Sequence, residues 1–486
     1  MHGPALPAVS TSSSVSPQHS LYIWGIALVA ALGGLLFGYD WVVIGGARQF
    51  YEVYFHLSSA GSVGWANSCA LIGCLFGSLA AGTLADRYGR RRILMAAAVL
   101  FAISSVLTGW AWSFSAFIFF RILGGAAIGL SSNVSPLYIA EISPAAHRGR
   151  LVSLNQFAIV VGILLAQVVN WRLARPVPVG LPADLLVQTW NVQYGWRWMF
   201  TAVTAPALVF TFASFFIPES PRWLMTHHRA DEGTAIVDLI EEGFRNRGRS
   251  IPPVTAPPSR LRGRRYTSFH EVLLTFFNFY PRRTLVGFSL MAAQAFFYNA
   301  IFFTYALVLT DFFHIRSDRI GWYILTFAVG NFFGPLALGW AFDTVGRRPM
   351  IALTYAVSGL LLAVSGALFA LDAITANQQT AAWMVVFFFA SAAASSAYLT
   401  VSEIFPLEIR ALAIAVFYAI GTGIGGMLTP WLFGALIDTG SRTSLFIGYL
   451  LGSALMIGAA AVEWCWGIAA EGRSLESVAR PLTFTD

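Results

Sequence analysis

Charged residues are scarce in this sequence, and one kind is missing altogether. Only 11% of the 486 residues are charged, whereas soluble domains contain about 25%. All 30 basic residues are arginines, and there is no lysine. Cysteine is also rare, because only Cys69, Cys74 and Cys465 occur, all in apolar stretches without a metal-ligand pattern. The composition therefore excludes an ordinary soluble domain, and we expect neither a bound metal nor a cofactor.

Long apolar runs are abundant instead. Hydrophobic residues make up 57% of the chain, and the mean hydropathy is +0.67. At about 20 apolar residues per span, the sequence predicts an all-α integral membrane protein with twelve transmembrane helices. The expected spans are 21–46, 62–84, 93–112, 114–140, 149–171, 197–217, 284–310, 319–342, 349–371, 381–403, 410–437 and 443–467.

Three polar segments flank or divide these spans. Residues 1–20 are rich in Ser and Pro and are predicted to be a disordered tail. Residues 218–283 separate two six-helix halves at 21–217 and 284–467, and 468–486 form a C-terminal tail. The central segment contains "IPPVTAPPS" and the helical pattern "RADEGTAIVDLIEEGFRN". We expect it to be a linker with short helices at the membrane surface.

The distribution of arginine predicts the orientation in the membrane. If the tails and the central segment are cytoplasmic, 22 arginines lie on the cytoplasmic side and 7 on the opposite side. The positive-inside rule then places both termini in the cytoplasm. The exclusive use of arginine suggests a GC-rich bacterial genome, so we expect the protein in the bacterial inner (plasma) membrane. The basic residues lie in loops, so they do not indicate nucleic-acid binding.

Two motifs occur twice in the same order. "GTLADRYGRR" (82–91) returns as "GWAFDTVGRR" (339–348), and "EISPAAHR" (141–148) returns as "EIFPLEIR" (403–410). The offsets, 257 and 262, are nearly equal. We infer that six helices were duplicated, which places a binding site between the two halves near the middle of the membrane.

The repeated motifs combine acids and arginines at the predicted cytoplasmic ends of helices. Such charges can pair in one conformation and separate in another, as alternating access requires. Orientation by the basic residues alone, or a static ion pair, remains an alternative. The candidate cytoplasmic gate consists of Asp86, Arg87, Arg90, Arg91, Glu141, Arg148, Asp343, Arg347, Arg348, Glu403 and Arg410.

Asp40 lies in the apolar run "GGLLFGYDWVVIGGA". A charge within a bilayer costs about 2.5–3.5 kcal/mol, so such residues pair or face a cavity. Arg121 is the one basic residue in the interior of a predicted span, since the others lie at span ends or in loops, and we therefore expect it to be the partner of Asp40. A fixed structural pair is the alternative to a functional one. Glu463, near the end of the last span, is a weaker second candidate that we expect at the membrane interface.

The chain resembles the major facilitator superfamily and, within it, the sugar porter family. The matching stretches are "GYDWVVIGGA", "DRYGRRR", "RILGGAAIGLSSNVSPLYIAEISPAAHRGRLVSLNQFAIVVGILLAQ", "PESPRWL" and "DTVGRR". The C-terminal "AEGRSLES" resembles a worn form of the family's closing motif. The resemblance implies the major facilitator fold. In proton-coupled members an aspartate at the position of Asp40 works with an arginine at the position of Arg121.

The resemblance also implies substrate contacts. Gln156 and Gln167 match two family glutamines on the fifth helix, and eleven residues apart they share one helix face. Further matches are Gln294, Asn299 and Asn331, and Tyr398 stands where the family has Trp. The alternatives are helix-to-helix hydrogen bonds for the amides.

The C-terminal half departs from the family pattern. Ala293 and Phe297 replace a family Gln and Gly, and Gly421 and Thr422 replace its Asn-Trp pair. An aromatic wall could replace lost sugar contacts, with ordinary core packing as the alternative. Its candidate members are Phe296, Phe297, Tyr298, Phe302 and Phe303.

The leading hypothesis is proton-coupled symport of a small polyhydroxylated solute, most simply a monosaccharide, by alternating access. A cyclitol, or an aromatic or organic acid, is the alternative cargo, and a non-transporting nutrient sensor is a third possibility. We find no catalytic constellation, so we do not expect an enzyme. The expected partners are the small-molecule substrate, protons and the lipid bilayer, without nucleic acid, and the expected state is a monomer.

Overall fold

The computed structural model describes residues 18–57, 60–144, 147–175, 183–245, 269–302, 304–315, 317–406, 409–421, 425, 428–471, 473 and 478–479. Regular structure in these residues is entirely helical, as expected where backbone groups must be satisfied within each segment. Ten of the described helices are long and apolar enough to cross a membrane. Two more crossings consist of shorter helices, so the twelve predicted spans fit the fold.

Five long helices make up most of the N-terminal half. They are α1 (Gln18–Tyr54), α2 (Ala60–Tyr88), α3 (Arg90–Gly109), α4 (Phe114–Ile142) and α5 (Arg148–Leu173). The sixth crossing is interrupted. After α6 (Ala183–Val187) it contains the π-helical turn η2 (Asn191–Gly195), α7 (Trp196–Ala202) and α8 (Thr204–Ala213). Pro206 cannot donate to the carbonyl of Ala202, which accounts for the break at Val203.

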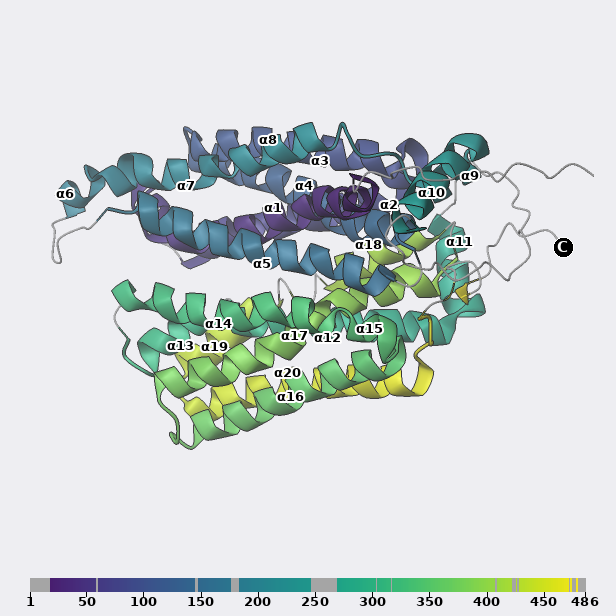
Figure 1. Ribbon diagram of the computed structural model, residues 1–486. Coiled ribbons are helices and arrows are strands. Elements are labelled where there is room, and N and C mark those ends of the chain that lie inside the picture. The colour runs from purple at the N-terminus through teal and green to yellow at the C-terminus, as the bar shows by residue number, and fades with distance from the viewer. Residues whose placement is uncertain are drawn as a thin grey trace, which may run out of the picture.

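The described part of the segment between the halves contains four short helices gathered at one end of the molecule (Figure 1). These are α9 (Pro221–Thr226), α10 (Ala230–Arg245), α11 (Phe269–Leu274) and the π-helical turn η3 (Thr275–Phe279). The pattern "RADEGTAIVDLIEEGFRN" correctly predicts α10, which packs against α9 and α1. The proline-rich stretch at 251–259 lies outside the described residues.

The C-terminal half repeats the arrangement with more interruptions. Its crossings are α12 (Pro281–Phe302) with α13 (Tyr305–Asp311), α14 (Ser317–Leu338) with α15 (Ala341–Thr344), α16 (Arg347–Ala370), α17 (Ala376–Ile404), α18 (Arg410–Gly421) with α19 (Thr429–Asp438), and α20 (Arg442–Trp466). In Figure 1 these green-to-yellow helices lie below the purple-to-teal helices of the first half. The two halves meet where α18 packs against α2 and where α14 and α17 pack against α5.

The duplication inferred from the motifs extends over whole helices. α4 and α17 each contain 29 residues and are offset by 262. α2 and α14 begin at Ala60 and Ser317, and α3 and α16 begin at Arg90 and Arg347, both offset by 257. Corresponding positions in the two halves can therefore be compared residue by residue.

Glycines let α1 and α5 pack backbone to backbone. A Cβ added to Gly38 would lie 1.9 Å from the carbonyl oxygen of Ile159, and one added to Gly162 would lie 2.0 Å from that of Leu35. Small residues allow this close approach in membrane helices. The contact fixes the two helices that form one wall of the central cavity.

Candidate functional site

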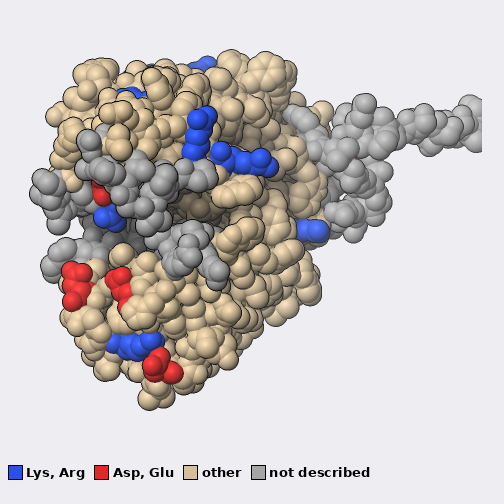
Figure 2. Space-filling model, turned by 90° about the vertical axis from the view of Figure 1, so that its left-hand side faces the viewer, with Lys and Arg blue, Asp and Glu red and all other residues tan. Residues whose placement is uncertain are grey.

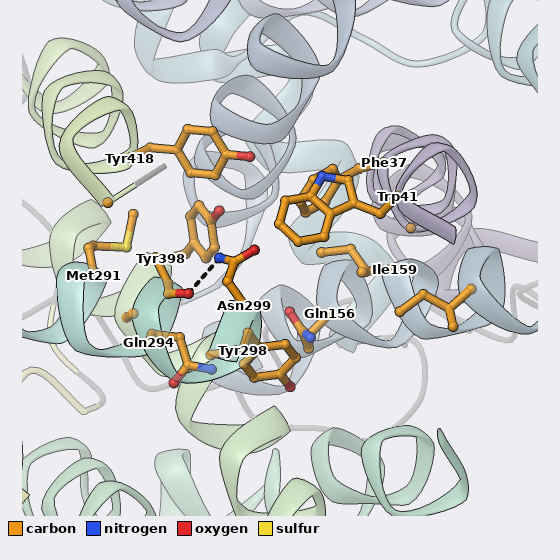
Figure 3. A pocket seen from close by; sticks show the side chains of 16 residues that line it. Phe37, Trp41, Gln156, Ile159, Met291, Gln294, Tyr298, Asn299, Tyr398 and Tyr418 are labelled. Carbon is orange, nitrogen blue, oxygen red and sulfur yellow. Dashed lines mark hydrogen bonds between the residues drawn. The ribbon is translucent and has the colours of Figure 1, made fainter. Parts of the chain in front are cut away.

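A cavity of about 120 Å³ lies between the two halves. Figure 3 shows side chains from both halves pointing into it. Among its lining residues are Phe37 and Trp41 of α1, Gln156, Ile159 and Ile163 of α5, Met291, Gln294, Tyr298 and Asn299 of α12, Tyr398 of α17 and Tyr418 of α18. The cavity thus combines aromatic faces with a few amide and hydroxyl groups, which is typical of sites for small molecules.

Of the six residues predicted to contact the substrate and Tyr298 of the predicted aromatic wall, seven in all, five line this cavity. They are Gln156, Gln294, Tyr298, Asn299 and Tyr398. The two amides of α12 are partly occupied: Gln294 Nε2 donates to the carbonyl of Ala390 at 3.3 Å, and Asn299 Nδ2 donates to that of Ala295 at 2.6 Å (Figure 3). Their oxygens, Oε1 and Oδ1, have no hydrogen-bond partner among the described residues. They can accept hydrogen bonds from a hydroxylated ligand.

Gln167 lies outside the cavity, contrary to the role expected from its helix face. It shares that face with Gln156, but eleven residues of α-helix span about 16 Å. The cavity ends on α5 at Ile163, four residues before Gln167. Sharing a helix face with Gln156 is therefore not enough to place Gln167 in the cavity, because the two residues are too far apart along the helix axis to line one small site.

Asn331 also lies outside the cavity, behind one of its walls. Its side chain is fully buried, and its Oδ1 accepts a 2.7 Å hydrogen bond from the Tyr298 hydroxyl. Its carbonyl oxygen accepts a second bond, from the Ser391 hydroxyl at 2.7 Å. In this structure Asn331 positions Tyr298 instead of facing the cavity.

The expected aromatic wall is only partly present. Tyr298 lines the cavity, whereas Phe296 packs against Phe433 and Phe297 against Phe387 within the C-terminal half. The side chain of Phe302 and the whole of Phe303 lie outside the described residues, as does Thr422. Three aromatic lining residues, Phe37, Trp41 and Tyr418, were missed, although the first two flank residues 38–40 in the run that contains Asp40.

Asp40 and Arg121 are in direct contact. Arg121 Nη1 donates to Asp40 Oδ1 at 2.5 Å, joining α1 to α4 across 81 positions. Both residues are buried, with exposed fractions of 7% and 4%. The Arg121 guanidinium also lies over the Phe200 ring, 5.4 Å from its centroid. Neither member lines the cavity, but Asp40 is next to Trp41, which does.

The repeated motifs form the same clamp in both halves. In the first, Arg90 Nε and Nη2 donate to the two oxygens of Glu141 at 3.0 and 3.1 Å, and Nη1 donates to the carbonyl of Ala85. Arg90 also lies 3.6 Å from Asp86. These contacts join the start of α3 to the end of α4.

In the second half Arg347 makes the corresponding bonds to Glu403, at 3.0 and 3.2 Å. Its Nη1 donates to the carbonyl of Phe342 and to Asp343, both at 2.6 Å. Each arginine is 1% exposed, so both clamps are buried. Bidentate arginine–carboxylate bonds of this kind are strong and geometrically specific.

Other motif residues connect the halves or brace helix ends. Arg148 Nη1 donates to Glu403 at 3.1 Å, and Asp343 accepts the backbone N–H groups of Gly149 and Arg150, both at 3.0 Å. These contacts close the end of the molecule that carries the repeated motifs, called the motif end below. Arg410 is fully buried and its Nη2 donates to the carbonyl of Phe405.

The second arginine of each copy also has an equivalent role. Arg91 donates to the carbonyls of Ser214 and Phe215, at 3.1 and 2.6 Å. Arg348 donates through Nε and Nη2 to the carbonyl of Trp464, at 2.7 Å for Nε. Arg87, by contrast, is exposed over the ring of Tyr88.

Sequence reasoning missed two acids that complete the clamps. Glu219, in "PESPRWL", accepts the backbone N–H groups of Arg90 and Arg91 at 2.8 and 3.1 Å. Glu471, in "AEGRSLES", accepts that of Arg347 at 3.2 Å. Both cap helix N-termini that follow a glycine of positive φ, Gly89 and Gly346. The sequence did offer a signal for both residues, because each is an acid within a stretch that resembles a motif of the family.

Glu463, which we expected at the membrane interface, is enclosed within the C-terminal half. It is 0% exposed, and both of its carboxylate oxygens are enclosed. The residue faces the interior of its half, and its depth in the membrane stays a prediction. Position along the chain could not reveal which way this helix face points.

A family model described as "Sugar (and other) transporter" matches residues 26–480. The glucose transport protein of Synechocystis sp. is 31% identical over 450 residues, covering 88% of this chain and 92% of that protein. The D-xylose-proton symporter of Escherichia coli is 40% identical over 247 residues, covering 46% of this chain and 48% of that protein.

A solved structure of the proton:xylose symporter XylE, bound to 6-bromo-6-deoxy-D-glucose, aligns with a TM-score of 0.79 and 27% identity. It covers 95% of this chain and 99% of that one. An inward-open structure of XylE from E. coli covers 94% and 99% at the same identity, with a TM-score of 0.63. The predicted major facilitator fold is confirmed. The chain belongs to the sugar (and other) transporter family, and it is a multi-pass membrane transporter and not an enzyme.

Proposed function

We propose that this protein is a proton-coupled symporter for a small polyhydroxylated solute, most simply a monosaccharide. The observation that carries the proposal is the buried Asp40–Arg121 pair, one residue from the cavity wall at Trp41. The free acceptor oxygens of Gln294 and Asn299 suit a ligand that brings hydroxyl donors. The activities named for the glucose transport protein and the D-xylose-proton symporter support the same substrate class.

The ion pair supplies the coupling step. Arginine stays protonated in proteins, so the group that gains or loses a proton is Asp40. A proton bound to the Asp40 carboxyl cancels its charge and removes the attraction that holds α1 against Arg121 of α4. Because α1 also lines the cavity, proton binding and substrate binding act on the same helix. The proton and the substrate therefore favour the same rearrangement.

The conformational cycle consists of rocking of the halves 21–217 and 284–467, connected by the linker 218–283. In this structure the motif end is closed by the contacts of Arg148 with Glu403 and of Asp343 with the start of α5. Opening this end requires these bonds to break while Arg90–Glu141 and Arg347–Glu403 hold each half together. We assign the eleven motif residues to this gate, with Arg87 at its exposed rim.

The motif end is assigned to the cytoplasm. The arginine bias supports this orientation, with both termini inside. The lower TM-score against inward-open XylE agrees with a motif end that is closed on the inward side. The expected setting is the bacterial inner membrane, with the chain acting as a monomer and without nucleic acid.

The cargo itself is open to a second candidate. Ile159, Ile163 and Met291 make much of the cavity apolar, which favours a solute with an apolar face, such as a cyclitol or an aromatic metabolite. No basic residue occurs among the described residues that line the cavity, so a simple anion is disfavoured. A thermal-shift screen of sugars, cyclitols and organic acids on the purified protein would distinguish these classes.

Transport in proteoliposomes tests the proposed coupling. With the outside more acidic, the wild type should accumulate radiolabelled D-xylose or D-glucose above equilibrium, and without the gradient it should only equilibrate. Asp40→Asn should abolish accumulation but preserve exchange of labelled for unlabelled sugar. Glu52→Gln, which removes a partly exposed acid of α1 that pairs with Arg48, is the matched control and should behave as the wild type. Accumulation by Asp40→Asn against a gradient would overturn the assignment.

A further inference from the structure

Besides Asp40 and the clamp glutamates Glu141 and Glu403, one more acid is buried among the described residues: Glu463 of the C-terminal half, which does not line the cavity. Glu463 is on the last turn of α20, which ends at Trp466. Its side chain is 0% exposed, and neither Oε1 nor Oε2 has a hydrogen-bond partner among the described residues. A buried carboxylate without hydrogen bonds or a cation is very costly, whereas the neutral acid is tolerated.

The carboxyl group lies at the C-terminal end of its own helix. A Cβ added to Gly467 would lie 2.4 Å from Glu463 Oε1, so the side chain is folded against the point where the chain leaves α20. The last carbonyls of a helix carry partial negative charge. This location therefore disfavours a second negative charge and suits a carboxyl group that holds a proton.

The nearby cations are occupied by other partners. On α16, Arg348 donates to the carbonyl of Trp464, and Arg347 is bound to Glu403 and Asp343. Tyr355, the buried tyrosine of the same helix, donates its hydroxyl to the carbonyl of Leu290.

The other helices packed against α20 offer no substitute. On α12, Arg283 donates to the carbonyl of Ile404, and Arg282 is exposed. On α19 the charged residue is Asp438, which is exposed at the C-terminal end of that helix. Of these cations, Arg348 is the one that binds next to Glu463, because it donates to the carbonyl of the following residue, Trp464.

The N-terminal half has the same arrangement without an acid. There Arg91 binds the carbonyls of Ser214 and Phe215 at the end of α8, as Arg348 binds that of Trp464 at the end of α20. The residues at that position are Ala213 and Ser214, and the Ser214 hydroxyl donates to the carbonyl of Phe210. The arginine–carbonyl contact therefore forms without a carboxyl group nearby. The acid at position 463 is not needed for this contact, which leaves room for another role.

We propose that Glu463 is a second proton-binding site, which keeps its proton while the motif end is closed and releases it when that end opens. On opening, the O–H bond of the carboxyl group breaks, the proton passes to water at the motif end, and the carboxylate pairs with Arg348. The inference rests on the proposed function for the direction of transport. It assigns Asp40 to proton uptake near the cavity and Glu463 to a proton-linked step at the motif end.

Infrared spectroscopy of the purified full-length protein tests the protonation state directly. A band of a protonated carboxyl group should be present in the wild type and in Asp40→Asn, and should be missing in Glu463→Gln. If Glu463→Gln leaves the carboxylic-acid bands unchanged, the residue is ionised and the proposal fails. This readout does not depend on transport, so it separates failure of this inference from failure of the proposed symport.

Exchange in proteoliposomes tests the link to opening. The wild-type exchange rate should vary with the pH on the motif-end side, by up to about tenfold per pH unit for one titrating group. Glu463→Gln and Glu463→Ser should both flatten this dependence, and the second introduces the residue type of the other half. The control is Glu232→Gln: Glu232 is exposed, and its hydrogen bonds from Arg229 lower the pKa of its carboxyl. An unchanged pH dependence in both Glu463 variants would overturn the proposal.

Discussion

The two halves share their clamps but differ in the chemistry of their interiors. In each half a buried arginine at the start of one helix binds a glutamate at the end of the next, through Arg90–Glu141 and Arg347–Glu403. Inside the bundles the repeat breaks down. At offsets of 257 and 262, Asp40 corresponds to Phe297 and Arg121 to Trp383. One half thus contains an ion pair where the other contains two aromatic side chains.

The aromatic positions are well packed. Phe297 lies against Phe387 with ring centroids 6.0 Å apart, and Trp383 lies against Tyr305 at 4.5 Å. Both residues are fully buried. The fold therefore does not need charges at these positions, since one half does without them. This difference supports a functional reason for the Asp40–Arg121 pair, because replacing a buried pair by apolar residues is often neutral or stabilising.

The largest expected effect comes from breaking that pair on one side. Arg121→Gln leaves a buried acid without its cation, and we expect a loss of about 3–5 kcal/mol in the free energy of unfolding. The double variant Asp40→Asn/Arg121→Gln should recover most of that loss, because it has no charge to leave unpaired. Chemical unfolding in detergent measures both.

The counterpart position provides the control for this prediction. Trp383→Phe removes part of a side chain but no charge, and it should cost less than Arg121→Gln. Two results would contradict this prediction: an Arg121→Gln variant as stable as the wild type, or a double variant no more stable than Arg121→Gln. Either would show that the ion pair does not make the expected contribution to the free energy of unfolding.

The second expected effect concerns the contacts between the halves. Glu403 binds Arg347 within its own half and Arg148 of the other. Glu403→Gln removes a charge from both bonds. Because hydrogen bonds to charged groups contribute about 1.5–3 kcal/mol, we expect the equilibrium to shift by at least about tenfold toward an open motif end.

An engineered cysteine at a position buried between the halves can report this shift toward an open motif end. Ser153 of α5 is 5% exposed, and a Cβ added to Gly339 of the other half would lie 3.0 Å from its hydroxyl oxygen. In a Cys465→Ser background, which removes the exposed cysteine, Ser153→Cys should react faster with a water-soluble thiol reagent when Glu403→Gln is present. Glu232→Gln should have no effect. An equal or slower reaction with Glu403→Gln would contradict the role of this glutamate in closure.

The sequence predicted the features that follow from the hydrophobic pattern, from repeated motifs and from the free-energy cost of a charge within the bilayer. Apolar runs are sufficient for the crossings, and repeated motifs at fixed offsets led to paired clamps. Elimination also identified the partner of Asp40, because an acid in a bilayer needs a cation and one candidate was available. Whether the pair carries protons stays a prediction that the transport experiments test.

Features that depend on helix rotation and depth were not predictable in the same way. Gln167 shares a face with Gln156 but lies beyond the cavity, and Asn331 points behind Tyr298. Tyr418 reaches the cavity because α18 packs against α2 of the other half. One sequence without its folded partners does not determine such contacts. The packing between helices does.

The smallest expected effect compares the acids that cap the two clamps. Glu219 accepts backbone N–H groups from Arg90, Arg91 and Ser220, whereas Glu471 accepts that of Arg347 at a longer 3.2 Å. A carboxylate at a helix N-terminus contributes about 0.3–1 kcal/mol. Glu219→Gln should therefore lower the temperature of unfolding more than Glu471→Gln, with both shifts small.

Thermal unfolding of the two variants in one detergent measures this difference, and its sign matters more than its size. If Glu471→Gln destabilises the protein as much as Glu219→Gln, the caps are equivalent and the clamps match throughout. If Glu219→Gln has the larger effect, the N-terminal clamp is the firmer of the two. The C-terminal clamp, whose Glu403 also bonds to the other half through Arg148, would then be the less stable of the two when that bond breaks on opening.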